Sequence, residues 1–218
     1  MKKICAIVGF GAGNGLAIAK AFGLEGHELA LIARSRAKQE KSLVELAALN
    51  LPARFYEADA SDVTALGSAF AQIREQLGSP TTLIYNAFAM RMGPPSKLSA
   101  EDLTADFRTN VAGALAATRE VLPAMRAEKN GTIIFTGGGF ALDPMPQFAS
   151  VGVGKAALRN LAFSLAKELK PDGIHVATVT IKGMVKAGSH FDPDKIAQAF
   201  LELYRQPAGS FTSELEYA

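Results

Sequence analysis

The sequence predicts an α/β fold: a single-domain, doubly wound parallel sheet of about seven strands with helices on both faces. Short apolar runs recur along the chain, and each is nearly continuous, as in strands that are buried on both faces. Longer segments with helical periodicity separate these runs, and this alternation is typical of a parallel sheet. With 49% hydrophobic and 20% charged residues in 218, the chain can bury one sizeable core, so we expect one domain over residues 1–218.

Each element follows from its local pattern. The predicted strands are 4–8, 29–33, 54–57, 82–85, 132–136, 176–181 and a short last strand at 214–217. The predicted helices are 15–24, 37–49, 63–77, 100–129, 151–170 and 194–204. Each of the first six strands is followed by a helix, and no repeat or linker interrupts the order.

Composition excludes several function classes. The net charge of +2 is dispersed, without the Lys/Arg block that tracks a nucleic-acid backbone. Cys5 is the only cysteine, which excludes an internal disulfide and a cysteine-based zinc site and suits a reducing cytosol. The start "MKKICAIVGF" breaks into glycines rather than a cleavage site, and no apolar run is long enough to span a membrane. We therefore expect a cytoplasmic protein without metal, nucleic-acid or membrane partners.

A glycine-rich turn in "AIVGFGAGNGLAIAKAF" joins the first predicted strand to the first predicted helix. It contains Gly9, Gly11, Gly13 and Gly15. Glycines in this context allow a tight turn and a close approach to a pyrophosphate, whose charge the helix N-terminus stabilises. The alternative is a glycine-rich turn without a ligand. The position between strand and helix favours a Rossmann-like dinucleotide site.

Further motifs extend this pattern over nearly the whole chain: Asp59 in "EADAS", Asn86-Ala87 in "YNAF", Asn110 in "FRTNVAG" and Lys155 in "VGKAAL". With these motifs, the chain resembles the short-chain dehydrogenase/reductase family. The resemblance implies a doubly wound seven-stranded sheet and hydride transfer between NAD(P) and an alcohol, carbonyl or activated double bond. It also implies a homodimer or homotetramer that pairs through the helices at 100–129 and 151–170. The positions that it assigns to the cofactor are Gly9, Gly11, Gly13, Asn14, Gly15, Asp59, Ala60, Asn86, Ala87, Lys155, Gly183 and Val185.

The end of the second predicted strand, "LIARSR", indicates which cofactor binds. An acidic residue there would accept from the ribose hydroxyl of NAD and repel a 2′-phosphate, but Ala33 takes that place. Because guanidinium pairs well with phosphate, we predict NADP(H) in preference to NAD, with Arg34 as the main contact and Ser35 as a helper. The alternative is that Arg34 and Arg36 are solvated charges. Asp59 would accept from the adenine amino group or, alternatively, serve as a turn residue.

The catalytic positions match the family only in part. The family uses an Asn, Ser, Tyr and Lys tetrad, and the resemblance assigns catalytic positions to Asn110 and Lys155. Val151 stands where the tyrosine is expected, four residues before Lys155, and Gly138 stands at the serine position. Acid/base catalysis contributes roughly 10²- to 10⁴-fold and an oxyanion donor a comparable factor, so losing both should nearly abolish ordinary carbonyl reduction.

No other side chain is an obvious substitute. Phe148 occupies the position that related enoyl reductases use for their tyrosine, and Thr136 and Ser150 would need a backbone rearrangement. Tyr85 is interpreted as a core aromatic at a strand end. Histidine is a common acid/base residue, but we expect His190 to be exposed and without a partner.

The substrate side is reduced to a short loop around residues 183–193. Lys182 replaces the usual proline before Gly183, and Phe88 adds apolar bulk in place of a glycine. Three hypotheses remain. The first is an NADP(H)-dependent oxidoreductase with an atypical site that acts on a small carbonyl, alcohol or enoyl substrate. The second is a catalytically inactive NADP(H)-binding regulator or scaffold, and the third is an interaction protein on a relic fold. The intact glycine turn and Arg34 argue against the third.

Overall fold

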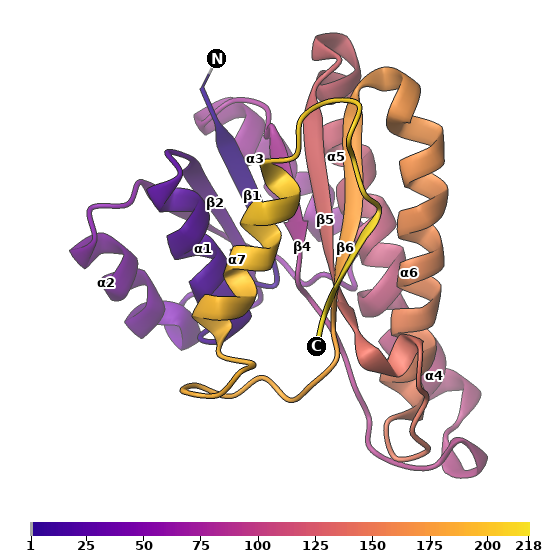
Figure 1. Ribbon diagram of the computed structural model, residues 1–218. Helices are drawn as coiled ribbons and strands as arrows, with labels where there is room; N and C mark the ends of the chain where they lie inside the picture. Colours follow the sequence, from indigo (N-terminus) through magenta and orange to yellow (C-terminus); the bar gives the residue numbers. More distant parts are fainter. Residues whose placement is uncertain (1) are drawn as a thin grey trace.

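The computed structural model describes residues 2–218, so residue 1 of the expected domain lies outside the described part. Seven strands form one sheet in the order β3-β2-β1-β4-β5-β6-β7, and every neighbouring pair is parallel (Figure 1). The predicted fold class is therefore confirmed. The strands are β1 (Ile4–Val8), β2 (Glu28–Ala33), β3 (Ala53–Glu57), β4 (Thr82–Tyr85), β5 (Gly131–Gly138), β6 (Ile174–Ile181) and β7 (Glu214–Tyr217).

Helices cover both faces of this sheet. They are α1 (Asn14–Leu24), α2 (Glu40–Ala48), α3 (Val63–Gln76), α4 (Ala100–Phe107), α5 (Gly113–Glu128), α6 (Ala149–Leu169) and α7 (Pro193–Tyr204). In Figure 1, α1, α2 and α7 lie on one face, and α3, α5 and α6 lie on the other. None of the helices in residues 2–218 combines the length and apolar character needed to cross a bilayer.

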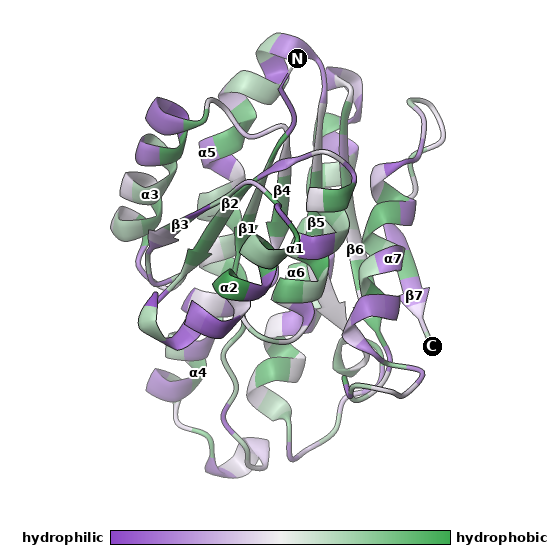
Figure 2. Cartoon of the chain, turned by 90° about the vertical axis from the view of Figure 1, so that its left-hand side faces the viewer, coloured by the Kyte–Doolittle hydropathy of each residue, from purple (hydrophilic) through white to green (hydrophobic). Residues whose placement is uncertain are grey.

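Two apolar cores result from this arrangement, one on each face. Within β1, Ala6 and Val8 pack on the α3, α5 and α6 side, whereas Cys5 and Ile7 pack on the α1 and α7 side. Successive side chains of a strand point to opposite faces, so a strand covered on both sides must be apolar throughout. The middle strands are accordingly hydrophobic in Figure 2, and hydrophilic segments are concentrated on the outer helices and loops.

One predicted helix is interrupted. The segment 100–129 was expected to be continuous, but α4 ends at Phe107, and Arg108–Ala112 form a wider π-helical turn before α5 begins. This turn carries Asn110 inward, where its amide pairs with the backbone of Ala89 in both directions, at 2.8 and 2.9 Å. Such single π turns often occur at functional sites. Periodicity missed the turn because one extra residue hardly changes an apolar pattern.

The sheet places its functional loops along one edge. Because all strands are parallel, their carboxyl ends meet there, and the chain order reverses between β1 and β4. Ligands of doubly wound sheets bind outside the carboxyl ends at such a switch point.

Candidate cofactor cleft and catalytic positions

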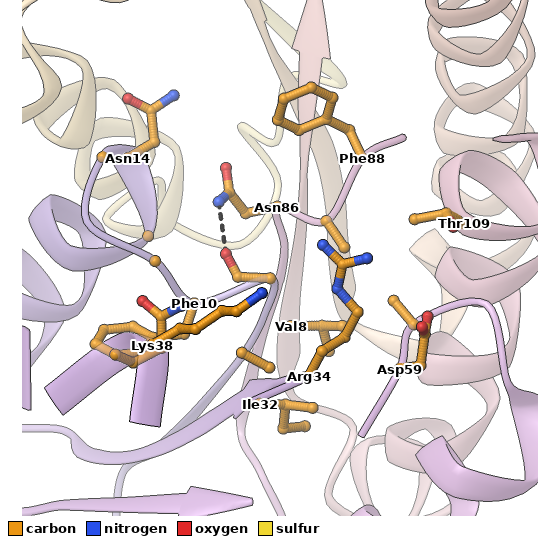
Figure 3. A pocket seen from close by; sticks show the side chains of 18 of the residues that line it. Val8, Phe10, Asn14, Ile32, Arg34, Lys38, Asp59, Asn86, Phe88 and Thr109 are labelled. Carbon is orange, nitrogen blue, oxygen red and sulfur yellow. Dashed lines mark hydrogen bonds between the residues drawn. The ribbon is translucent and has the colours of Figure 1, made fainter. Parts of the chain in front are cut away.

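A cleft of about 700 Å³ opens at the carboxyl ends of β1, β2 and β4 (Figure 3). The glycine turn forms one wall, and the segments that follow β2, β3 and β4 form the others. The sequence-predicted residues that line it are Gly9, Gly11, Gly13, Asn14, Gly15, Arg34, Ser35, Asp59, Ala60, Asn86, Ala87 and Val185. The switch point therefore carries a cavity built from the expected segments.

The glycines of the turn have two different roles. Gly9 has φ +87°, and a Cβ there would overlap the backbone of Ala87. A Cβ at Gly15 would lie 2.9 Å from the carbonyl oxygen of Gly9. In contrast, a Cβ at Gly13 would meet no described atom within 4 Å. Packing within the chain thus explains Gly9 and Gly15, whereas Gly13 leaves free space at the cleft.

The first two residues of α1, Asn14 and Gly15, line this space. No side chain among residues 2–218 caps the first turn, because the residue before the helix is Gly13. The side-chain oxygen of Asn14 is buried without a hydrogen-bond partner. Unpaired N–H groups and the positive end of the helix dipole favour an anion here. The glycine turn therefore fits the pyrophosphate of a dinucleotide.

Two cations stand on the β2 side of the cleft. Arg34 follows β2 and is exposed, and Lys38 extends along the same wall (Figure 3). Arg36 does not line the cleft: its guanidinium lies over the ring of Phe55 at 5.9 Å, and its backbone N–H donates to Glu57 at 3.4 Å. Of the two arginines that follow β2, only Arg34 lines the cleft.

Asp59 brings one negative charge to the cleft wall. Its carboxylate accepts from the backbone N–H and the hydroxyl of Ser61, both at 2.8 Å. The Ser61 backbone hydrogen bond, with the Ser61 hydroxyl and the nearby charge of Arg34, lowers the pKa of Asp59. This carboxylate is ionised at neutral pH and also organises its own turn.

Asn86 joins the ends of three strands. Its amide nitrogen donates to the carbonyl of Gly9 at 2.9 Å, and its amide oxygen accepts from the Thr136 hydroxyl at 2.9 Å. The side chain therefore fixes the floor of the cleft between β1, β4 and β5.

Lys155 is buried near this floor but is not among the residues that line the cleft. Its ammonium group donates to the carbonyl of Thr136 at 2.5 Å and lies 5.8 Å from the ring centroid of Phe88. Burial lowers the pKa of Lys155 to about 8. Asn110, held by Ala89, also stays outside the lining. A Cβ at Gly154 would lie 2.6 Å from the Asn110 amide nitrogen, so α6 and the π-helical turn pack closely here.

The two positions singled out beside Lys155 carry no polar side chain. Gly138 is the last residue of β5, and a Cβ there would lie 3.5 Å from the Lys155 side chain, an ordinary contact. Val151 is buried in the first turn of α6, which begins at Ala149, two residues before the predicted start. Phe148 stacks on Phe140 at 4.7 Å.

The hydroxyl groups nearby have other partners. Thr136 donates to Asn86. The Ser150 hydroxyl accepts from the Arg91 backbone N–H at 3.0 Å and donates to its carbonyl at 3.3 Å. Tyr85 is fully buried, donates to the carbonyl of Thr109 and has a raised pKa because of burial, as the interpretation of a core aromatic implies.

The loop after β6 contributes one residue to the cleft. Val185 lines it, whereas Gly183 packs where a Cβ would overlap the ring of Phe191. His190 is exposed as expected, but the expectation that it lacks a partner was wrong: Nε2 pairs with the carbonyl of Ala218 at 2.7 Å, and the ring stacks on Tyr217 at 5.1 Å. These partners are 27 and 28 residues away, so local sequence could not indicate them.

Sequence reasoning missed several lining residues, among them Phe10, Ala12, Lys38, Gln39 and Thr109. For Lys38 a signal existed, because it lies four residues after Arg34. Phe10 and Ala12 lie between the glycines of the turn, so the motif itself carried a signal for them, whereas only the folded chain brings Gln39 and Thr109 to the cleft.

Comparisons with known proteins agree with this geometry. A family model described as short chain dehydrogenase matches residues 3–191. The 2-(S)-hydroxypropyl-CoM dehydrogenase 3 of Xanthobacter autotrophicus is 30% identical over 216 residues, which cover 96% of this chain and 84% of that protein. The 3-oxoacyl-[acyl-carrier-protein] reductase of Rattus norvegicus is 28% identical over 218 residues, 100% of this chain and 89% of that one. A metagenomic short-chain oxidoreductase solved in complex with NADP superposes with a TM-score of 0.90 at 27% identity, over 99% and 97% of the two chains.

Proposed function

This chain belongs to the short-chain dehydrogenase family of oxidoreductases, and from that premise we propose that it is an NADP(H)-dependent oxidoreductase with an atypical active site. The observation that carries the proposal is the cleft itself, in which an uncapped glycine turn and the cations Arg34 and Lys38 line one cavity. Its substrate is a small carbonyl, alcohol or activated enoyl compound.

The cleft residues divide the cofactor between them. The glycine turn and the α1 N-terminus hold the pyrophosphate. Arg34 and Lys38 hold the 2′-phosphate of NADP(H), since charge-assisted hydrogen bonds to phosphate are the strong ones and no acid follows β2 to repel it. Asp59 accepts from the adenine amino group, and Lys155, Asn86 and Val185 meet the nicotinamide half.

The bound nicotinamide supplies or accepts a hydride, and the chain must manage the accompanying proton. We propose that Val151 and Gly138 replace the family's tyrosine and serine. The hydroxyl groups of Tyr85, Thr136 and Ser150 already have protein partners, which supports the absence of a phenolic or seryl donor. An activated enoyl substrate suits such a site best, because hydride adds to its β-carbon and water can protonate the resulting enolate at the α-carbon.

The same engaged hydroxyl groups favour a second candidate, an NADP(H)-binding regulator or scaffold without turnover. Both candidates require cofactor binding and differ only in turnover. The exposed apolar side chains of Leu115 on α5 and Val153 on α6 support subunit pairing through these helices, as a homodimer or homotetramer; light scattering tests that assembly.

Titration with NADPH and NADH, followed by calorimetry, tests the proposal. We expect NADPH to bind more tightly, and Arg34→Ala to weaken NADPH binding by about 10- to 100-fold, since a hydrogen bond to a charged group contributes about 1.5–3 kcal/mol. Arg36→Ala is the matched control, because this arginine lies over Phe55 outside the cleft lining. Failure to bind either cofactor, or equal loss in both variants, would contradict the proposed site.

Turnover separates the two candidates. Oxidation of NADPH by an enone supports the enzyme, whereas binding without turnover supports the regulator. Introducing Gly138→Ser and Val151→Tyr together should create or raise ketone reduction, because space beside Lys155 accommodates a side chain at 138. The double variant must first retain NADPH binding, which shows that it is folded.

A further inference from the structure

Exposed apolar side chains gather on three loops, two of which contribute a residue to the cleft. We call this group the apolar rim; its members are Phe88, Met90, Met92, Leu142, Met145, Met184 and Val185, and all are exposed. They lie on the loops that follow β4, β5 and β6. Of the five methionines in residues 2–218, four are in the rim and only Met125 is in the core. Exposed apolar surface of this kind marks a binding site when it is contiguous.

The rim loops lie beside one another and beside the cleft. Gly93, in the loop after β4, forms a parallel bridge with Phe148, and its backbone N–H donates to the carbonyl of Gln147 at 3.0 Å. Phe88 and Val185, from the loops after β4 and β6, line the same cleft. The rim is therefore continuous with the cavity assigned to the cofactor.

Three of the cations near the rim, Arg91, Lys155 and Lys182, are already engaged. The Arg91 guanidinium pairs with Asp106 and, at 3.1 Å, with Asp102. Lys155 donates to a backbone carbonyl near Phe88, and Lys182 pairs with Glu216 at 3.1 Å. The other exposed charges on the three loops are those of Lys97, Asp143 and Lys186, which are of mixed sign. This surface thus holds no concentrated positive charge for an anionic substrate.

We propose that the substrate of this site is an uncharged molecule with a flexible apolar chain beside its carbonyl or enoyl group. This inference rests on the proposed function, in which the cleft holds NADP(H). The chain lies on the rim while the reacting carbon meets the nicotinamide near Val185. Methionine side chains are unbranched and polarisable, so they adapt to a flexible aliphatic partner. Because three cations are engaged and the remaining charges are dispersed and of mixed sign, a carboxylate or phosphate substrate finds no cluster of counter-charges here.

A ligand series tests the substrate class without requiring turnover. 2-Alkanones of four to ten carbons are titrated by calorimetry into the protein saturated with NADP⁺, which cannot reduce them, and into the protein alone. Each methylene buried on the rim should lower Kd by up to about fourfold, since it contributes about 0.8 kcal/mol. The alkanoate of each chain length should bind at least tenfold more weakly than the ketone, because it must lose hydration without gaining a counter-charge.

Variants locate the effect on the rim. Met145→Gln with Met184→Gln keeps side-chain length and charge but removes apolar character, so it should weaken decanone binding by about tenfold and flatten the dependence on chain length. Leu24→Gln is the matched control: Leu24 is an exposed apolar residue at the end of α1, outside the cleft, and its change should leave the series unaltered.

The outcomes distinguish the two proposals. If the protein does not bind NADP⁺, the proposed function is contradicted. The ketone series titrated into the protein without cofactor then still tests whether the rim binds apolar chains. Chain-length independence both with and without cofactor, tighter binding of the alkanoates, or an unchanged series in the double methionine variant overturns the substrate class.

Discussion

Lys155→Met should change how the stability of the protein depends on pH. In the folded chain, burial lowers the pKa of the Lys155 amine from 10.5 to about 8. The unfolded chain therefore holds more protons between these values, and folding becomes more favourable as pH rises through that window. Below pH 8 the buried charge costs about 3 kcal/mol, at about 1.36 kcal/mol for each tenfold change in proton affinity.

The variant has no amine to titrate, so it lacks this dependence. Between pH 7 and pH 10, the free energy of unfolding of the natural chain should rise by about 2 to 3 kcal/mol relative to Lys155→Met. At pH 7 the variant should be about as stable as the natural chain or more so, because the lost hydrogen bond from the charged amine to Thr136 contributes about 1.5–3 kcal/mol, no more than the cost of the buried charge. Its NADPH affinity should nevertheless fall, since the amine is assigned to the cofactor.

Urea denaturation of both proteins at several pH values measures this difference. Lys186→Met, which removes an exposed charge of the same sign, reports the effect of net charge alone. Parallel stability curves for the natural chain and Lys155→Met would refute the reasoning, because they would show that the amine titrates alike in the folded and unfolded states.

Gly9→Ala should lower the free energy of unfolding by several kcal/mol and abolish NADPH binding, because Gly9 has φ +87° and the new Cβ overlaps the backbone of Ala87. Gly13→Ala should fold normally and lose only NADPH affinity, because the space around Gly13 is free. Thermal unfolding and titration of both variants check this contrast. Burial lowers the pKa of His27, so the contribution of its neutral ring to stability is complete above pH 6.5 and is lost as pH falls. The melting temperature should therefore fall between pH 7 and pH 5, and His27→Gln should make this fall smaller. Tyr217→Phe removes a 3.0 Å hydrogen bond to the loop that carries Val185, so amide exchange there should quicken and NADPH affinity should fall modestly.

The sequence by itself determined the fold class, because continuous apolar runs between helical segments leave few alternatives to a helix-covered parallel sheet. It also determined the glycine turn, since strand, glycines and helix are contiguous in the chain and their mutual geometry is local. The second strand, predicted from residue 29, therefore needed no information from distant parts of the chain.

Only the tertiary structure decided what depends on distant partners. It placed the Arg36 guanidinium over the ring of Phe55, and it gave Tyr85, Thr136 and Ser150 partners up to 59 residues away. It interrupted the helix at Asn110, because the amide pairs with Ala89 across the fold. Hydrogen bonds and burial between segments far apart in sequence arise only when the chain is packed, so no local pattern could indicate the state of Lys155.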